Sequence, residues 1–151
     1  MWGNAVTKPQ LIWHLESERS VLPIRGEPDA AGVDLSITHD AIIPPGARHR
    51  LDFGLRVAIP RGYYGLAVLR SSMRARGLTD LGAGIIDSGY RGPLSGIVCN
   101  LSTFNVHLEA GHRVFQMILM AHADYEQGLA ETIEDLGPSI RGEGGFGSTG
   151  K

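Results

Sequence analysis

Asp87 lies in the nine-residue segment 84–92, in which three residues are glycine. Apolar residues precede the aspartate, and the Asp-Ser-Gly triplet that it opens is typical of a turn between two strands. We expect those strands over residues 83–86 and 90–94. A carboxylate held at such a turn can orient a water molecule and take its proton during attack on a phosphorus atom. An aspartate that only opens the turn fits the same pattern equally well.

Two further regions contain residue types that bind anions. Residues 46–76 include seven arginines against one acid, Asp52, and the forked guanidinium of arginine suits phosphate. Residues 142–150 include five glycines, whose backbone N–H groups can approach an anion closely. Arg141 precedes this segment and Phe146 interrupts it. We expect a mobile lid there, whereas the arginine-rich stretch alone is explained equally by a solvated basic face.

The elements that must position these residues are mostly strands. Alternating or β-rich runs cover five segments: 33–37, 55–59, 63–69, 94–101 and 114–120. Turn sequences separate them at short intervals, which favours an antiparallel β-sandwich or barrel. One stretch, residues 71–77, predicts a short helix with Ser71 as N-cap and Gly77 as its stop.

Composition narrows the class of protein. The chain has 151 residues, one cysteine, and 14 basic against 16 acidic residues, a net charge of −2. A single cysteine excludes an intrachain disulfide scaffold, and the near-neutral charge argues against a general nucleic-acid-binding protein. No apolar run approaches the roughly 20 residues of a membrane span. We therefore expect a cytoplasmic globular protein that binds neither nucleic acid nor membrane.

Five segments, in this order along the chain, resemble the five motifs of the trimeric dUTPases, the deoxyuridine triphosphate diphosphatases. The resemblance covers about residues 20–150. The segments are AGVDL (31–35), RSSM (70–73), GIIDSGYRG (84–92), GHRVFQMI (111–118) and RGEGGFGSTG (141–150). The resemblance implies an all-β jelly-roll barrel or sandwich, a homotrimer with shared active sites, and hydrolysis of dUTP to dUMP and pyrophosphate with Mg²⁺. This reaction would limit uracil in DNA and supply dUMP.

The resemblance also assigns expected roles around the nucleoside. Asp87 would be the base that activates water for attack on the α-phosphorus. Main-chain groups of the hairpin, at Gly84 and Ile86, would read uracil. Tyr90 would pack under the deoxyribose and leave no room for a 2′-hydroxyl. For the base, unpaired buried polar groups would make discrimination of uracil from cytosine by the main chain strong.

Other matching residues would bind the phosphates. Gln116 and the helix-start residues Arg70, Ser71 and Ser72 are expected to contact them, and Arg141 would clamp the triphosphate in the transition state. Asp34 would lie near the water shell of the metal and position the closing arm. Magnesium would be held by the substrate phosphates and have no direct protein ligand. The remaining expected substrate contacts lie in the arm: Gly144, Gly145, Phe146, Gly147, Ser148 and Thr149.

Some residues depart from the family pattern. Ser72 replaces the usual glycine and favours the dCTP deaminases, which share the fold. Ile97, however, occupies the position of the glutamate that deamination needs, and no glutamate lies between Asp87 and Glu109. Gly89 replaces a frequent acid, and His112 and Phe115 replace an acid and a small residue.

The sequence predicts three segments and leaves two alternative functions open. We expect an N-terminal extension at 1–20, a β-barrel domain at 21–136 and a mobile glycine-rich arm at 137–151. The alternatives are a dCTP deaminase-like enzyme and a trimer of the same fold that binds another protein under control of nucleotide.

Overall fold

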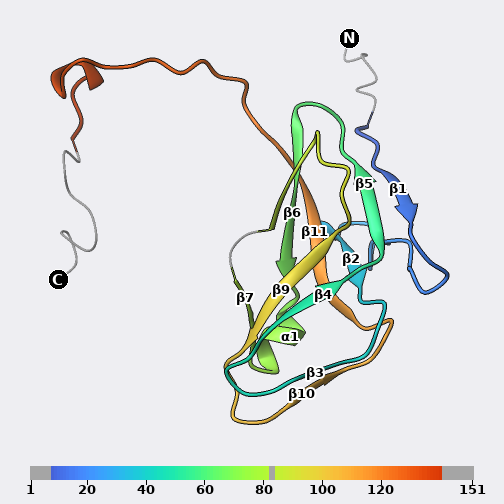
Figure 1. Ribbon diagram of the computed structural model, residues 1–151. Coiled ribbons are helices and arrows are strands. Elements are labelled where there is room, and N and C mark those ends of the chain that lie inside the picture. Colours follow the sequence, from blue (N-terminus) through green and yellow to red (C-terminus); the bar gives the residue numbers. More distant parts are fainter. Residues whose placement is uncertain (1–7, 82–83, 141–151) are drawn as a thin grey trace.

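The computed structural model describes residues 8–81 and 84–140. Within these ranges the chain forms eleven strands, one short α-helix and one 3-10 turn (Figure 1). The helical elements are α1 (Ser71–Ala75) and η1 (Glu134–Leu136). The strands are β1 (Ile12–Leu15), β2 (Gly32–Ser36), β3 (Ala41–Ile43), β4 (Arg48–Asp52), β5 (Leu55–Ala58), β6 (Tyr63–Leu69), β7 (Leu78–Asp80), β8 (Gly84–Asp87), β9 (Ser95–Asn100), β10 (Val106–Leu108) and β11 (Arg113–Ala121).

Two antiparallel sheets enclose the core. One has four strands in the order β2-β11-β6-β8, and the other has three in the order β4-β9-β7. Two smaller antiparallel pairs, β1-β5 and β3-β10, complete the described strands. The expected all-β jelly-roll sandwich with one short helix is confirmed, and the sheets do not close into a barrel.

Side chains alternate between the core and the outer face of the four-stranded sheet. On β6 every second residue is buried, and on β11 Phe115 and Met117 are buried while the alternate residues Gln116 and Ile118 are half-exposed. Strand geometry imposes this period of two, because successive side chains point to opposite faces. The inner residues join one hydrophobic cluster that includes Leu35, Leu51 and Val98.

The structure corrects two local expectations. Residues 90–94 do not form a strand, since the chain turns with the Tyr90 N–H donating to the Asp87 carbonyl, and Pro93 has no N–H for a ladder. Ser71 is the first residue of α1 and not its N-cap, which is Arg70 without a side-chain capping bond. The predicted stop is confirmed, because Gly77 follows the C-cap with φ of 85°.

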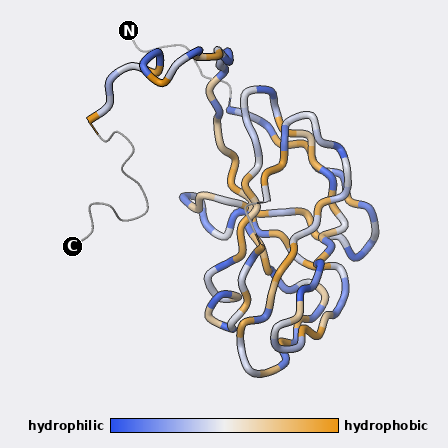
Figure 2. The backbone as a smooth tube through the Cα atoms, turned by 60° about the vertical axis from the view of Figure 1, so that its left-hand side comes forward, coloured by the Kyte–Doolittle hydropathy of each residue, from blue (hydrophilic) through white to orange (hydrophobic). Residues whose placement is uncertain are grey.

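The chain leaves the sandwich after β11. Every residue from 121 to 140 is exposed, and Figure 1 shows this segment, in orange and red, running away from the two sheets. Figure 2 shows that hydrophobic and hydrophilic residues are mixed along it. Most of the arm predicted at 137–151 lies outside the described residues. At the other end, β1 falls inside the predicted extension 1–20 and pairs with β5.

No helix in the described part of the chain is long and apolar enough to cross a membrane.

Candidate active site

Asp87 ends β8, an edge strand of the four-stranded sheet. It lies opposite Tyr64 of β6, and its side chain is exposed, whereas the preceding Ile86 points into the core. No other described residue forms a hydrogen bond or ion pair with the Asp87 carboxylate. Both oxygens are therefore free to accept a proton from a water molecule.

A cavity of about 200 Å³ lies beside Asp87. An apolar cavity of about 150 Å³ accommodates a benzene ring, so this space has room for a six-membered ring. Main chain and side chain from β8, the following turn and the start of β9 form its wall. The lining residues are Phe53, Ala67, Gly84, Ile85, Ile86, Asp87, Tyr90, Pro93, Leu94 and Ser95.

The ring of Tyr90 is held against this cavity by its neighbours in the turn. Its hydroxyl donates to the Pro93 carbonyl at 3.0 Å. A Cβ atom at position 92 would lie 2.3 Å from that hydroxyl oxygen, so only glycine lets the ring fold over this part of the chain. Gly92 thus fixes the position of Tyr90, a function that a turn glycine does not reveal in the sequence.

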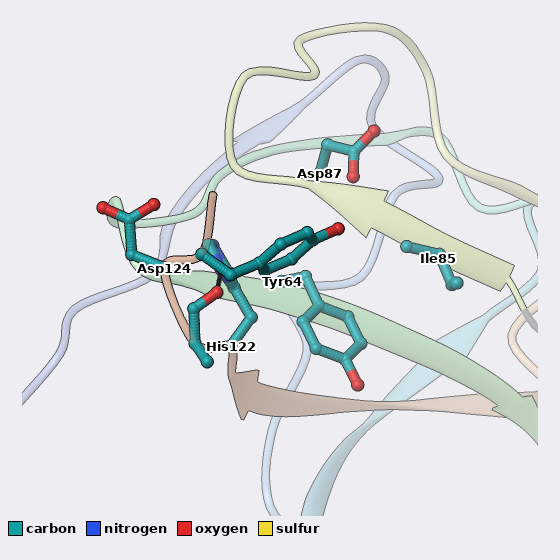
Figure 3. Close-up of a pocket in the computed structure, with 7 residues that line it drawn as sticks. Tyr64, Ile85, Asp87, His122 and Asp124 are labelled. Carbon is teal, nitrogen blue, oxygen red and sulfur yellow. Dashed lines mark hydrogen bonds between the residues drawn. The ribbon is translucent and has the colours of Figure 1, made fainter. Parts of the chain in front are cut away.

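A wider cavity of about 470 Å³ opens on the outer side of Asp87 (Figure 3). Tyr64, Ile85, His122 and Asp124 line it together with two further residues after β11, Ala123 and Tyr125. In Figure 3 the carboxylates of Asp87 and Asp124 point away from each other. Asp87 is therefore accessible on the side where residues 122–125, which follow β11, line the cavity.

The predicted phosphate residues meet at a third cavity, of about 360 Å³. Gln116 of β11 lies opposite Asp34 of β2, and Arg70 and Ser71 join the same wall from the junction of β6 and α1. Gly26, Glu27, Ala30 and Gly32 complete the lining. Ser72, although predicted with this group, is exposed on α1 and lines none of the cavities described here.

Asp34 binds two arginines in this cavity. Its carboxylate accepts from Arg70 Nε at 3.0 Å and from Arg113 at 3.0 Å, and the side chain is 12% exposed. Arg70 also donates to the Arg113 carbonyl at 3.2 Å. The ion pair with Asp34 and the bond to the Arg113 carbonyl hold Arg70 in place in the cavity wall.

Arg113 was not among the predicted site residues. Its partner Asp34 lies 79 positions earlier, and only the pairing of β11 with β2 brings the two together. Its place in the segment 111–118 is the one sequence signal that could have indicated it.

Within one chain, the residues predicted to bind the nucleoside lie far from those predicted to bind the phosphates. The cavities at Asp87 share no lining residue with the cavity at Arg70. Two strands, β6 and β11, separate Asp87 from Asp34, and adjacent strands lie about 4.8 Å apart. Their positions also differ by four residues along β11, so the separation is about 20 Å.

The other predicted site residues lie in the wall of the 200 Å³ cavity or outside the described part of the chain. Ile86 is buried and lines the 200 Å³ cavity, as does Gly84. The arm residues Arg141, Gly144, Gly145, Phe146, Gly147, Ser148 and Thr149 lie outside the described residues.

The chain was compared with known proteins. The family model described as dUTPase matches residues 18–150. A deoxyuridine 5′-triphosphate nucleotidohydrolase of Oryza sativa subsp. japonica is 42% identical over 134 residues, which span 89% of this chain and 77% of the relative. The enzyme of the same name from avian adenovirus 8 is 39% identical over 98% of this chain and 90% of its own length.

Solved structures show the same fold. The dUTPase of Staphylococcus bacteriophage 80alpha, solved with dUPNHPP, has a TM-score of 0.86 and 25% identity, covering 94% of this chain and 99% of the phage chain. A phage phi11 dUTPase mutant, whose structure concerns a structural Mg(II) ion, has a TM-score of 0.76 at 22% identity, over 83% of this chain and 99% of that one. Its sequence and its fold both match, and this chain belongs to the dUTPase family.

Proposed function

We propose that this chain hydrolyses dUTP to dUMP and pyrophosphate, with Asp87 as the general base. The observation that carries the proposal is the exposed Asp87 carboxylate, which has no partner among the described residues and lies at the wall of a cavity with room for a pyrimidine ring. Membership in the dUTPase family and the names of the relatives supply the substrate.

The hydrolytic step follows from the position of Asp87. Its carboxylate takes a proton from a water molecule, whose oxygen attacks the α-phosphorus in line with the bond to the bridging oxygen. That bond breaks, pyrophosphate leaves with the bonding electrons, and dUMP keeps the new oxygen. General-base catalysis of this kind contributes roughly 10²–10⁴ in rate.

Base and sugar recognition are assigned to the 200 Å³ cavity. Main-chain groups of Gly84 and Ile86 border it, and a fixed pattern of backbone donors and acceptors distinguishes the pyrimidine edges. We assign Tyr90, whose hydroxyl bonds to the Pro93 carbonyl, the role of excluding a 2′-hydroxyl.

A second copy of the chain is proposed to supply the phosphate contacts. The separation of about 20 Å between Asp87 and Asp34 exceeds the reach of one triphosphate within one chain. Between them, the outer face of the four-stranded sheet carries the apolar side chains Leu66, Ile85 and Ile118. Packing this face against another copy would place Arg70, Ser71 and Gln116 of one subunit beside Asp87 of the other. We assign the assembly as a homotrimer, with Arg141 and Phe146 of the arm closing the shared site.

Magnesium is proposed to be carried by the substrate. No cluster of three His, Cys, Asp or Glu side chains within the described ranges could hold a metal ion. Arginines already bind both oxygens of Asp34, so that carboxylate is not free as a direct ligand. Held on the phosphates, Mg²⁺ would neutralise part of the charge that builds up on the leaving pyrophosphate.

The dCTP deaminase alternative is not supported. The family match and the relatives are dUTPases, and position 97 carries a half-exposed isoleucine in place of a glutamate. A second function in binding another protein, and the cytoplasmic location, stay predictions.

The test is an assay of pyrophosphate release from dUTP, dTTP, dCTP and UTP by the purified protein, with ammonia release measured in parallel. We expect turnover of dUTP with Mg²⁺, kcat/KM for the other nucleotides at least 100-fold lower, and no ammonia. Equal rates for the four nucleotides, or ammonia from dCTP, would contradict the assignment.

A further inference from the structure

Phe115 and Gly96 fit together between the two sheets. Phe115 belongs to β11 and Gly96 to β9, and both point inward. A Cβ atom at position 96 would lie 2.5–2.9 Å from three atoms of the Phe115 ring, closer than real side chains approach. The ring therefore occupies the space that any larger residue at position 96 would fill. Phe115 is 3% exposed, so this space is inside the core.

The ring borders the region where the base is read. A cavity of about 190 Å³, lined in part by Phe115 and Gly96, shares Ala67, Gly84 and Ser95 with the cavity assigned to the base. Phe115 also packs on Phe53, which lines the base cavity, with ring centroids 5.5 Å apart and planes at 60°. The aromatic pair thus lies beneath both cavities, where β8 and β9 begin.

We propose that Phe115, seated over Gly96, is a positioning residue that determines the size of the base cavity and thereby excludes pyrimidines substituted at C5. The inference rests on the proposed function for the identity of the base. Phe115 has no polar atom and cannot read the hydrogen-bonding edge of a base. It acts through volume, by supporting the backbone at Gly96 and Ser95 and keeping the two cavities separate.

The size of the effect follows from apolar recognition. One extra methyl group in an apolar pocket changes kcat/KM by about 10–200-fold. Loss of the ring would leave an enlarged apolar space connected to the base cavity, and an apolar space of this size accepts an apolar group. Discrimination against the 5-methyl group of dTTP should fall within that range, whereas discrimination based on hydrogen bonds should persist.

The experiment compares kcat/KM for dUTP, dTTP and dCTP in four variants. Phe115→Leu and Phe115→Ala enlarge the space, Phe115→Ala/Gly96→Val refills part of it, and Met117→Ala is the control. Met117 lies on the same strand and face, is equally buried, and lines neither cavity. We expect the dUTP/dTTP ratio to fall at least tenfold in the Phe115 variants, to recover in the double variant, and to stay within threefold in the control.

The outcomes separate this inference from the proposed function. If the unmodified protein releases no pyrophosphate from dUTP, the proposed function fails. If it hydrolyses dUTP but the Phe115 variants keep their dUTP/dTTP ratio, or Met117→Ala lowers the ratio as much, the role of Phe115 is overturned. An equal fall in the dUTP/dCTP ratio would indicate general loosening and would overturn it as well. Should Phe115→Ala fail to fold, Phe115→Leu decides the question, since it retains most of the apolar volume.

Discussion

At the scale of single residues, the proposed active site contains two carboxylates in contrasting surroundings. Asp87 is exposed and has no partner among the described residues, whereas Asp34 is nearly buried and binds two arginines. The first is available to take a proton, and the second is committed to holding cations in place.

Asp87→Asn tests the first of these roles. The amide keeps the size and the turn but cannot take the proton from water. We expect kcat for dUTP to fall by roughly 10²–10⁴ with KM changed less than threefold. Steady-state kinetics measures both, and a matched Asp124→Asn variant, on the wider cavity, should leave kcat within a few fold. A kcat within tenfold of the unmodified enzyme would remove Asp87 from the role of base.

Asp34→Asn tests the second role. Without the carboxylate, the guanidiniums of Arg70 and Arg113 repel each other and Arg70 loses its fixed position. We expect a higher KM for dUTP and, because the arginines are 30% and 50% exposed, a loss of only about 1–2 kcal/mol in the free energy of unfolding.

Asp52→Asn is the matched control for that variant. It breaks the exposed pair with Arg50, in which the side chains are 47% and 59% exposed, and should cost less than about 1 kcal/mol without changing KM. Urea titrations of both variants measure the free energy of unfolding, and steady-state kinetics measures KM. An unchanged KM in Asp34→Asn would show that Asp34 does not position Arg70 for substrate.

At the scale of elements, a buried side chain organises the connection that follows β9. Asn100 is fully buried, and its amide donates to the carbonyls of Ile43 and Phe104 at 2.8 Å. Its side-chain oxygen accepts from the N–H and the hydroxyl of Ser102. These bonds tie the β9–β10 connection to β3 and replace the ladder that the loop lacks.

We expect Asn100→Ala to lower the free energy of unfolding by about 2–4 kcal/mol, because it leaves several buried polar groups without partners. Since Asn100 lines none of the cavities described here, kcat/KM for dUTP at 20 °C should stay within threefold. Thermal unfolding and the pyrophosphate assay check the two parts. A large loss of activity in a folded variant would place this connection in the active site.

Some elements could be predicted from the sequence and others could not. Long strands with clear alternation, such as β6, were predictable, since one buried face imposes the period of two. The three-residue strands β3, β7 and β10 were missed because so short a run has no visible period. Asp87 and Gln116 were proposed as site residues from residue type and motif, and these assignments stay predictions. The Asp34–Arg113 pair and the fit of Phe115 over Gly96 depend on strand pairing across distant parts of the chain.

At the scale of the whole molecule, the two proposed half-sites of the 16.2 kDa chain line different cavities. If the proposed trimer forms, light scattering should give about 49 kDa, three times the chain mass. A mass of one chain at micromolar concentration would contradict a shared site.

Mixing two inactive variants tests whether each active site is built from two subunits. Asp87→Asn removes the proposed base but keeps the phosphate-binding residues. Arg70→Ala removes a phosphate-binding residue but keeps Asp87. A site built from both halves of one chain would be defective in every subunit of a mixture. A site shared between neighbours is intact wherever the Asp87 of an Arg70→Ala chain meets the Arg70 of an Asp87→Asn chain.

Random mixing in equal amounts places those two halves together in about one quarter of the sites of a cyclic trimer. We therefore expect the mixture, unfolded and refolded together, to recover about one quarter of the specific activity of the unmodified protein. Each variant refolded alone, and the two combined after refolding, should stay at the background rate. Both halves of the site come from described residues, Asp87 on β8 and Arg70 before α1. Background activity in the co-refolded mixture, with hybrid trimers verified by mass spectrometry, would mean that the phosphate donors act on the Asp87 of their own chain.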